Sequence, residues 1–298
     1  ARDAAGSQDY PQGTLYVVAT PIGNLADVTL RALHVLELAD AIACEDTRHT
    51  QSMLRAYGID RKLLAVHQHN EAQAAQSVIA RLQQGERIAY VSDAGTPGVS
   101  DPGARLADAV RAAGHRVLPL PGASSVTTLL SAAGLVAADA DESSAFVFAG
   151  FLPNGRVLGE GATQRLPGER RAVVLLEAPH PTEALARALA VLEGRRVTIG
   201  RELTKQFEEI DTVAAKDLAA WLSAKEQRTR GEFALVLHPA AAHDGGADEG
   251  ERVLRLLLPE LPVKSAVRLA AEITGAPRNA LYERALQLRQ AAQQDDGD

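Results

Sequence analysis

From Thr14 onward, the sequence alternates short apolar runs with longer amphipathic stretches, and this alternation is what most restricts the fold. Strands that alternate with helices build a largely parallel sheet, because each helix returns the chain to the edge where the next strand starts. The first five runs are TLYVVA (14–19), ADAIAC (39–44), KLLAVH (62–67), ERIAYV (86–91) and HRVLPL (115–120). They predict an α/β domain over residues 14–121.

Beyond residue 121 the helices between apolar runs become fewer, which predicts a second α/β domain with a mixed sheet over residues 122–240. The runs are SAFVFAG (144–150), RAVVLLE (171–177), RVTIGRE (196–202), EEIDTVA (208–214) and EFALVLH (232–238). Residues 239–250 have the glycine, alanine and acidic composition of a linker. Residues 251–290 predict a C-terminal appendage of two short helices, and residues 1–13 a disordered leader.

Composition excludes several classes of protein. The formal net charge of −7 argues against attraction of the whole surface to nucleic acid or to an anionic membrane. Cys44 is the only cysteine, which excludes an intrachain disulfide and a multi-cysteine zinc site and fits a reducing compartment. The sequence has no apolar stretch of 18 residues, so we expect a cytoplasmic protein without a membrane span and without a metal.

Three loops rich in glycine and proline follow predicted strands: TPIGNL (20–25), SDAGTPGVSDPG (92–103) and PGASS (121–125). Ligands bind at the carboxyl ends of parallel strands, where such loops would meet. We expect the glycines to let the backbone approach a ligand, although tight strand-to-helix turns are the alternative. The loops match neither the dinucleotide nor the P-loop motif, which favours a cationic or neutral nucleoside derivative. Asp101 is also expected to cap the helix over 101–114.

Two charged segments could supply reacting groups. CEDTRHT (44–50) ends the second predicted strand, and its structural alternative is an ion-paired helix N-terminus. RELTKQFEE (201–209) follows a later strand and is either a solvated face or the far wall of a cleft.

The motifs TPIGNL, EDTRHT, HNE, SDAGTPGVSDPG, PLPG with SAAGL, GFLP, EAPH and RELTK occur in this order. Together they resemble the tetrapyrrole methylase superfamily and, within it, the ribosomal RNA small subunit methyltransferase I group, from about Thr14 to Gln290. LPVKSAVRLAAEITGAPRNALYERAL is similar to the helical appendage of that group. The segment 154–181 departs from the group's usual pattern, with Asn154 and Gly155 after GFLP and Pro181 in place of an arginine.

The resemblance implies a methyltransferase that uses S-adenosylmethionine to methylate the ribose 2′-hydroxyl of a decoding-centre cytidine in 16S rRNA, within the small ribosomal subunit. It also implies a two-domain tetrapyrrole methylase-like fold and a homodimer. By position, the residues that would bind the cofactor are Pro21, Gly23, Asp93, Ala94, Gly95, Thr96, Val99, Ser124, Ser125, Glu177, Leu203, Phe233 and Ala234.

The chemistry of this methyl transfer indicates which residues could be catalytic. A ribose hydroxyl needs help to lose its proton, so a carboxylate, histidine or lysine near the cofactor is expected as general base. The candidates are Glu45, Asp46, His49, Glu202 and Lys205.

Residues 251–290 carry seven basic and four acidic side chains, which favours phosphate contacts by this appendage. The RNA-binding candidates are Arg48, Lys264, Arg268, Arg278 and Arg284.

Three other interpretations stay open at the level of sequence. A methylase of a porphyrin or corrin precursor would share the cofactor loops but has no use for a basic appendage. A non-catalytic RNA-binding module would keep the fold and lose cofactor binding. The two C-terminal helices could also be an ordinary solvated hairpin.

Overall fold

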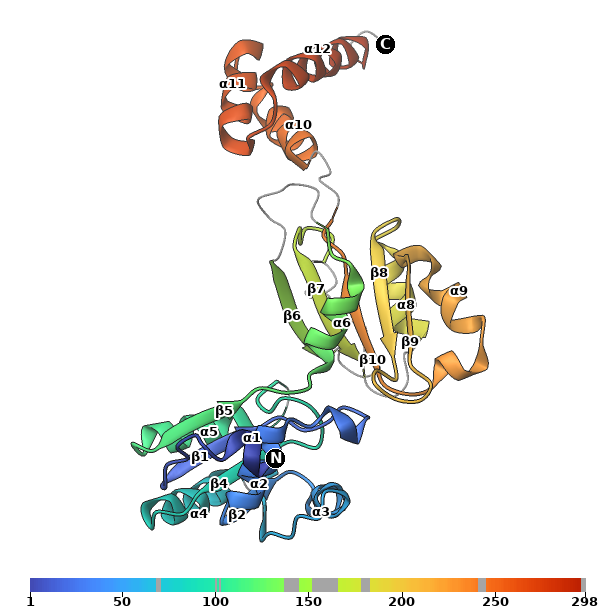
Figure 1. Cartoon of the computed structure of the whole chain (residues 1–298). Coiled ribbons are helices and arrows are strands. Elements are labelled where there is room, and N and C mark those ends of the chain that lie inside the picture. The colour runs from blue at the N-terminus through green and yellow to red at the C-terminus, as the bar shows by residue number, and fades with distance from the viewer. Residues whose placement is uncertain are drawn as a thin grey trace. The chain divides into compact units, whose positions relative to one another are not determined.

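The computed structural model describes residues 1–67, 71–99, 101, 103–136, 145–151, 166–177, 183–240 and 245–295. Contacts along the chain divide it into two compact units, Ala1–Pro239 and Ala240–Asp298. The first unit contains two β-sheets with their own helices, and the second is helical (Figure 1).

The first sheet is parallel and has the strand order β3-β2-β4-β1-β5. Its strands are β1 (Thr14–Val18), β2 (Ala41–Cys44), β3 (Leu63–Ala65), β4 (Ile88–Val91) and β5 (Arg116–Leu120). All five lie inside the predicted apolar runs, so the predicted parallel-sheet domain is confirmed. Because β1 lies between β4 and β5, segments distant in sequence become neighbours.

Helices cover both faces of this sheet. They are α2 (Leu30–Leu38), α3 (Thr47–Ala56), α4 (Glu71–Gln83) and α5 (Gly103–Ala112). Tyr16 is buried with Leu36 of α2 and Met53 of α3, whereas its neighbour Leu15 is buried with residues of α4 and α5, such as Leu106. Successive strand residues point to opposite faces, so burial of both faces requires the nearly continuous apolar runs seen in the sequence.

The first thirteen residues are ordered, so the predicted disordered leader is wrong. They include the short helix α1 (Arg2–Ala5). The Tyr10 hydroxyl donates to the carbonyl of Ala5 (2.9 Å), and Arg87 Nε donates to the carbonyl of Tyr10 (2.8 Å). The Tyr10 ring also lies 6.3 Å from that of Tyr16. One aromatic side chain thus holds the segment on the domain, although its local composition is polar.

The second sheet has the order β6-β7-β10-β8-β9. Its strands are β6 (Phe146–Phe151), β7 (Ala172–Glu177), β8 (Arg196–Arg201), β9 (Glu209–Ala214) and β10 (Phe233–Leu237). β6 and β7 are parallel and the other neighbours are antiparallel, which confirms the predicted mixed sheet. The register places Ala234 opposite both Leu176 and Gly200, and this pairing shapes the site described below.

Each face of the second sheet is covered by different helices. α6 (Ser125–Ala133) packs on one face, in a cluster that contains Leu129, Leu176 and Leu203. α8 (Glu183–Ala190) and α9 (Leu218–Ser223) pack on the other. Short 3₁₀ helices complete the unit: η1 (Leu25–Asp27), η2 (Ala215–Asp217) and η3 (Glu226–Thr229). Ile22 and Val99, from loops of the first sheet, pack against the α6 cluster.

The second unit packs three helices around its own core: α10 (Gly245–Leu257), α11 (Val263–Thr274) and α12 (Arg278–Asp295). The linker predicted over 239–250 is therefore wrong from residue 245, and the appendage has one helix more than predicted. Glycine, alanine and aspartate at the start of α10 resemble a linker, but the helix continues into the buried Leu254. None of the helices that the structure describes has the length and apolar character needed to cross a membrane.

Candidate active site

The loops that follow β1, β4 and β5 meet at the carboxyl edge of the parallel sheet, because these strands are neighbours. Thr20 and Gly95 pair across two of these loops, with backbone N···O distances of 3.0 and 3.1 Å. The Thr20 hydroxyl donates to the carbonyl of Ser92 (3.3 Å), and the Thr96 hydroxyl to that of Ala123 (3.0 Å). Hydrogen bonds therefore connect the three loops that the sequence analysis singled out.

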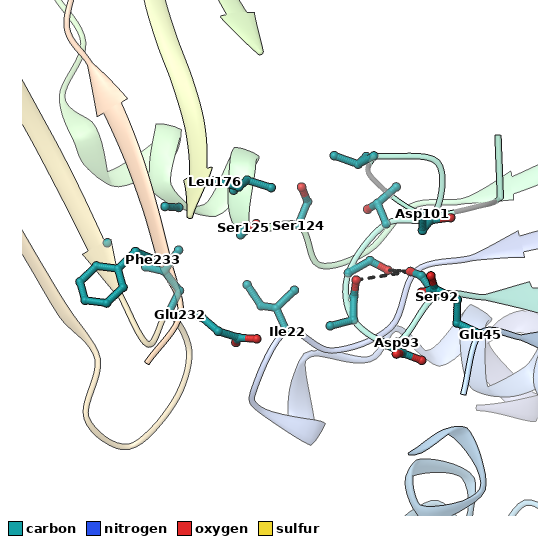
Figure 2. A pocket seen from close by; sticks show the side chains of 17 residues that line it. Ile22, Glu45, Ser92, Asp93, Asp101, Ser124, Ser125, Leu176, Glu232 and Phe233 are labelled. Atoms are coloured by element: carbon teal, nitrogen blue, oxygen red, sulfur yellow. Dashed lines mark hydrogen bonds between the residues drawn. The ribbon is translucent and has the colours of Figure 1, made fainter. Parts of the chain in front are cut away.

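A cavity of about 430 Å³, the main pocket, lies at these loops (Figure 2). Its volume is typical of small-molecule sites, and its position matches that of ligands in open parallel sheets. Loops of the first sheet contribute Ile22, Glu45, Ser92, Asp93, Ala94, Gly95, Thr96, Val99 and Asp101. The opposite wall consists of Ser124, Ser125, Leu176, Gly200, Leu203, Glu232, Phe233 and Ala234.

The glycines of SDAGTPGVSDPG have different roles. Gly95 and Gly98 have φ values of 80° and 87°, a backbone conformation that side chains disfavour. A Cβ atom at Gly103 would lie 2.3 Å from Cε1 of Tyr90, so this glycine makes room for a buried ring. The expectation that all three admit a ligand is therefore wrong for Gly103, whereas Gly95 lines the main pocket.

Four carboxylates line the main pocket, namely those of Glu45, Asp93, Asp101 and Glu232. Among the described residues around it there is no lysine, arginine or histidine. Burial raises the pKa of Glu45, and the charges of Asp93 and Asp101 raise it further. Because carboxylates repel anions, the pocket favours a cationic or neutral ligand over a polyphosphate.

Asp93 and Asp101 also hold the backbone around the pocket. Asp93 Oδ1 accepts a hydrogen bond from the backbone N–H of Asp46 (3.1 Å). Asp101 Oδ1 accepts from the backbone N–H of Gly103 (2.7 Å) and from the hydroxyl of Tyr90 (3.1 Å). The predicted capping role of Asp101 at α5 is confirmed, and the same carboxylate lines the main pocket.

The EDTRHT segment divides between the pocket and the surface. Glu45 lines the pocket, whereas Asp46 is the N-cap of α3 and accepts from the backbone N–H groups of Arg48 (2.8 Å) and His49 (3.4 Å). These two hydrogen bonds lower the pKa of Asp46. The side chains of Arg48 and His49 are exposed. For these three residues the structure matches the capping alternative.

A second group of charged side chains, the rim cluster, consists of Glu202, Lys205 and Glu232. Lys205 Nζ lies 2.9 Å from Glu202 Oε1 and 2.7 Å from Glu232 Oε2. Burial lowers the pKa of Lys205, but hydrogen bonds to Glu232 and Glu202 outweigh it, so the net shift is upward. A lysine held protonated between two carboxylates is a poor base. A Cβ atom at Gly23 would lie 2.5 Å from Lys205 Cγ, so this glycine lets the TPIGNL loop contact the cluster.

The comparison with known proteins bears directly on this pocket. A family model described as "Tetrapyrrole (Corrin/Porphyrin) Methylases" matches residues 14–219. A protein named "Ribosomal RNA small subunit methyltransferase I" from Escherichia coli O157:H7 is 47% identical over 94% of this chain and 97% of its own length. The chain belongs to the tetrapyrrole methylases and, among them, to the ribosomal RNA small subunit methyltransferase I family. The resemblance expected from the sequence is confirmed.

Similarity to further proteins and to a second family model supports this assignment. A protein of the same name from Xylella fastidiosa (strain Temecula1 / ATCC 700964) is 45% identical over 91% of this chain and 98% of its own length. The solved structure of a cobalt precorrin-4 methyltransferase has a TM-score of 0.57 at 17% identity and covers 77% of this chain and 98% of its own, which supports the fold alone. A second model, described as "RsmI C-terminal HTH domain", matches residues 244–289. Enzymes of this family take their methyl group from S-adenosylmethionine.

Most residues expected to bind this methylase's cofactor line the main pocket. They are Asp93, Ala94, Gly95, Thr96, Val99, Ser124, Ser125, Leu203, Phe233 and Ala234. Pro21 and Gly23 lie in the loop after β1, where their neighbour Ile22 lines the pocket instead. The backbone of Glu177 pairs with Phe233 at the end of β7, and its side chain lies outside the described part. Parts of the HNE, GFLP and EAPH motifs, and most of the departures over 154–181, also lie outside the described residues.

The pocket contains residues that the sequence analysis missed: Ile22, Asp101, Leu176, Gly200 and Glu232. The first two lie inside motifs quoted for the family, so the motif itself was the available signal. Leu176 and Gly200 line the pocket because both are opposite Ala234 in the sheet, and Glu232 precedes β10. Sequence periodicity cannot show which strands will be neighbours.

Four of the predicted RNA-binding residues belong to the helices of the second unit. Arg268 and Arg278 lie 3.4 and 3.3 Å from carboxylate oxygens of Glu272. Arg284 lies 2.5 Å from Glu251 Oε2, and Lys264 is exposed. These contacts are at the surface, where ion pairs contribute little stability and exchange readily with phosphate.

Proposed function

We propose that this protein transfers a methyl group from S-adenosylmethionine to the ribose 2′-hydroxyl of a cytidine in the decoding centre of 16S rRNA. The observation that carries the proposal is the main pocket, with four carboxylates and no cationic side chain among its described lining residues. The relatives that are 40 to 47% identical carry the name of a small subunit rRNA methyltransferase.

The residues present fit the cofactor. Carboxylates suit its sulfonium and ammonium charges, and Asp93 is the candidate for a charged contact. Leu176 and Ala234 form an apolar wall that would accept the adenine ring, whereas the ring of Phe233 is buried on the other face of the second sheet. Bound S-adenosylmethionine supplies an electrophilic methyl group, and the pocket's task is to hold that group in line with the ribose oxygen.

Glu45 is the best candidate for the general base. Of the five candidates, it alone lines the main pocket. Asp46 caps α3, His49 is exposed, and Lys205 is held between two carboxylates. Burial and the charges of Asp93 and Asp101 raise the pKa of Glu45, which makes its ionised form a stronger proton acceptor than an ordinary glutamate.

RNA binding is assigned to residues 251–290 of the second unit, which carry seven basic and four acidic side chains. We place the reaction in the cytoplasm, on the assembled small subunit, with a homodimer as the active form. A solution mass of about twice the 31.5 kDa of one chain would support the dimer. A monomeric mass would contradict it.

Two other functions remain as outcomes of one experiment. Small subunits from cells that lack this enzyme are incubated with the protein and labelled S-adenosylmethionine, and the labelled nucleotide is mapped. Label on the 2′-oxygen of a decoding-centre cytidine supports the proposal. Label only on added uroporphyrinogen or precorrin would indicate a tetrapyrrole methylase, and RNA binding without cofactor binding would indicate a non-catalytic module.

A further inference from the structure

An exposed aromatic side chain lies close to the main pocket without being part of it. Phe207 is 72% exposed, although it is a large apolar residue in a charged segment. It lines a separate groove of about 540 Å³, the Phe207 groove, together with Arg201, Gln206, Lys225 and Gln227. The function proposed above does not use this residue.

Hydrogen bonds fix the position of Phe207. Arg201 Nη1 donates to the carbonyl of Phe207 (3.3 Å). The backbone N–H of Glu208 donates to the carbonyl of Lys205 (3.1 Å), and Glu208 Oε2 accepts from the backbone N–H of Thr204 (2.6 Å). The loop that carries the Phe207 ring is therefore held by hydrogen bonds, so little backbone entropy is lost when a ligand binds to the ring.

The groove and the main pocket are neighbours in the same sheet. Arg201 lines the groove, and its cross-strand partner Phe233 borders the main pocket at the start of β10, with its ring buried on the α8 and α9 face of the sheet. Leu203 lines the pocket four residues before Phe207, which limits the separation of their Cα atoms to about 14 Å. A polymer whose reacting sugar faces the main pocket would therefore pass within reach of the Phe207 groove.

The chemistry of the groove favours a nucleobase. A single phenyl ring among polar side chains offers a stacking face but no extended apolar patch for a protein partner. The amides of Gln206 and Gln227 can donate and accept hydrogen bonds at the edge of a base. The carboxylates of Glu208 and Glu209 line the groove together with the cations of Arg201 and Lys225. Glu209 is also hydrogen-bonded to Lys225 and Arg228, so the groove repels phosphate less than the main pocket does.

We propose that Phe207 stacks on an unpaired base next to the methylated nucleotide and so positions the target ribose. This inference rests on the proposed function and adds a substrate contact to it. Phe207 would be a positioning residue, because it does not touch the reacting atoms.

The test compares Phe207→Ala, Phe207→Leu and Phe207→Tyr with wild-type protein. Loss of one stacked base should raise KM for small subunits about tenfold or more in the alanine and leucine variants, with a smaller change in kcat. The tyrosine variant should stay near wild type, and the affinity for S-adenosylmethionine should not change in any of them. Val191→Ala, which truncates another exposed apolar side chain, is the matched control.

A spectroscopic experiment tests stacking itself. A synthetic RNA carries a 2′-deoxycytidine at the target position, so that it cannot be methylated, and 2-aminopurine at the nucleotides on either side. Wild type and the tyrosine variant should quench one of the two probes, and the alanine variant should quench neither. Equal quenching, or none, by wild type and the alanine variant would overturn the proposal, as would a dimer that dissociates in the alanine variant. If the wild-type protein does not methylate small subunits, the proposed function is contradicted. If it does, and KM is unchanged in all the Phe207 variants, only the role of Phe207 is contradicted.

Discussion

At the scale of single residues, the chemistry of the main pocket depends on a few carboxylates with different partners. Asp93 and Asp101 each accept hydrogen bonds from the chain around them, whereas Glu45 is half-buried and feels the charges of both. The first two are suited to hold structure and bind positive charge. Glu45 is suited to exchange a proton.

Replacing Asp93 by asparagine tests the charged contact. Asparagine keeps an oxygen that can accept from the backbone of Asp46 and removes only the charge. We expect the free energy of S-adenosylmethionine binding, measured by calorimetry, to become less favourable by about 1.5 to 3 kcal/mol. Asp108→Asn, at an exposed position of α5, is the control and should bind normally. Unchanged affinity in Asp93→Asn would remove this residue from the cofactor site.

Replacing Glu45 by glutamine tests the general base. We expect the methylation rate to fall by about 10² to 10⁴ while cofactor affinity is retained. Burial raises the pKa of Glu45 above its ordinary 4.5, so the wild-type rate should decrease, as pH is lowered, at a pH above 4.5. The glutamine variant should lack this decrease. A variant with the wild-type rate would show that another group takes the proton.

Glu45→Gln, which should lower the methylation rate, should raise the stability of the folded protein. Because the pKa of Glu45 is raised in the folded protein, folding favours its protonated form and is opposed by its ionised form above that pKa. Glu45→Gln should therefore have a higher free energy of unfolding than wild type at pH 8, and this advantage should shrink below pH 4.5. Urea denaturation at both pH values measures it.

At the scale of elements, the second sheet holds the far wall of the pocket in register. β9 is tied to η3 by Glu209, which accepts from Lys225 Nζ at 2.8 Å and from Nε of the buried Arg228 at 3.0 Å. The Arg228 guanidinium also stacks on the Trp221 ring at 3.8 Å. These contacts connect the edge strand to the segment that leads back into β10.

Replacing Glu209 by glutamine should destabilise this part of the protein in a pH-dependent way. The hydrogen bond from Arg228 lowers the pKa of Glu209 from 4.5 to about 2, so the stabilisation is complete above pH 4.5 and is lost as pH falls toward 2. We expect a loss of about 2 kcal/mol at pH 7 and a smaller loss at pH 3, from urea denaturation. Glu226→Gln, in an exposed pair with Arg230, should change little at either pH. An equal loss at both pH values would contradict this account.

At the scale of the whole molecule, cofactor binding is assigned to the first unit and most RNA phosphate contacts to the second. The main pocket belongs wholly to Ala1–Pro239, and the segment 251–290, with seven basic and four acidic side chains, belongs to Ala240–Asp298. Such a division lets a chain with a net charge of −7 bind RNA through one locally basic part.

Deleting residues 240–298 tests this division. The shortened protein should bind S-adenosylmethionine with unchanged affinity in calorimetry. Its affinity for rRNA should fall at least tenfold, and the dependence of that affinity on salt should become weaker because fewer phosphates are contacted. Full RNA affinity in the shortened protein would move RNA binding to the first unit.

Much of the fold could be predicted from the sequence, because each buried strand corresponds to a local run of apolar residues. The apolar runs located all ten strands of the described residues to within two residues at each end. The motifs also located most of the pocket, since Gly95 and Asp93 lie in a loop whose composition alone indicates close turns. Local composition misled where contacts with distant residues decide the outcome, as when Tyr10 packs near Tyr16 and accepts from Arg87, or when Leu254 joins the core of the second unit.

What tertiary structure alone decided is which distant residues share a surface. The sequence determined the strands, the capping role of Asp101 and the family, because these depend on neighbours within a few residues. Only strand order and register place Leu176 and Gly200 around Ala234, and only the fold turns Glu45 inward while Asp46 caps a helix. The physical reason is that periodicity reports whether a side chain is buried, whereas long-range pairing determines what it is buried against.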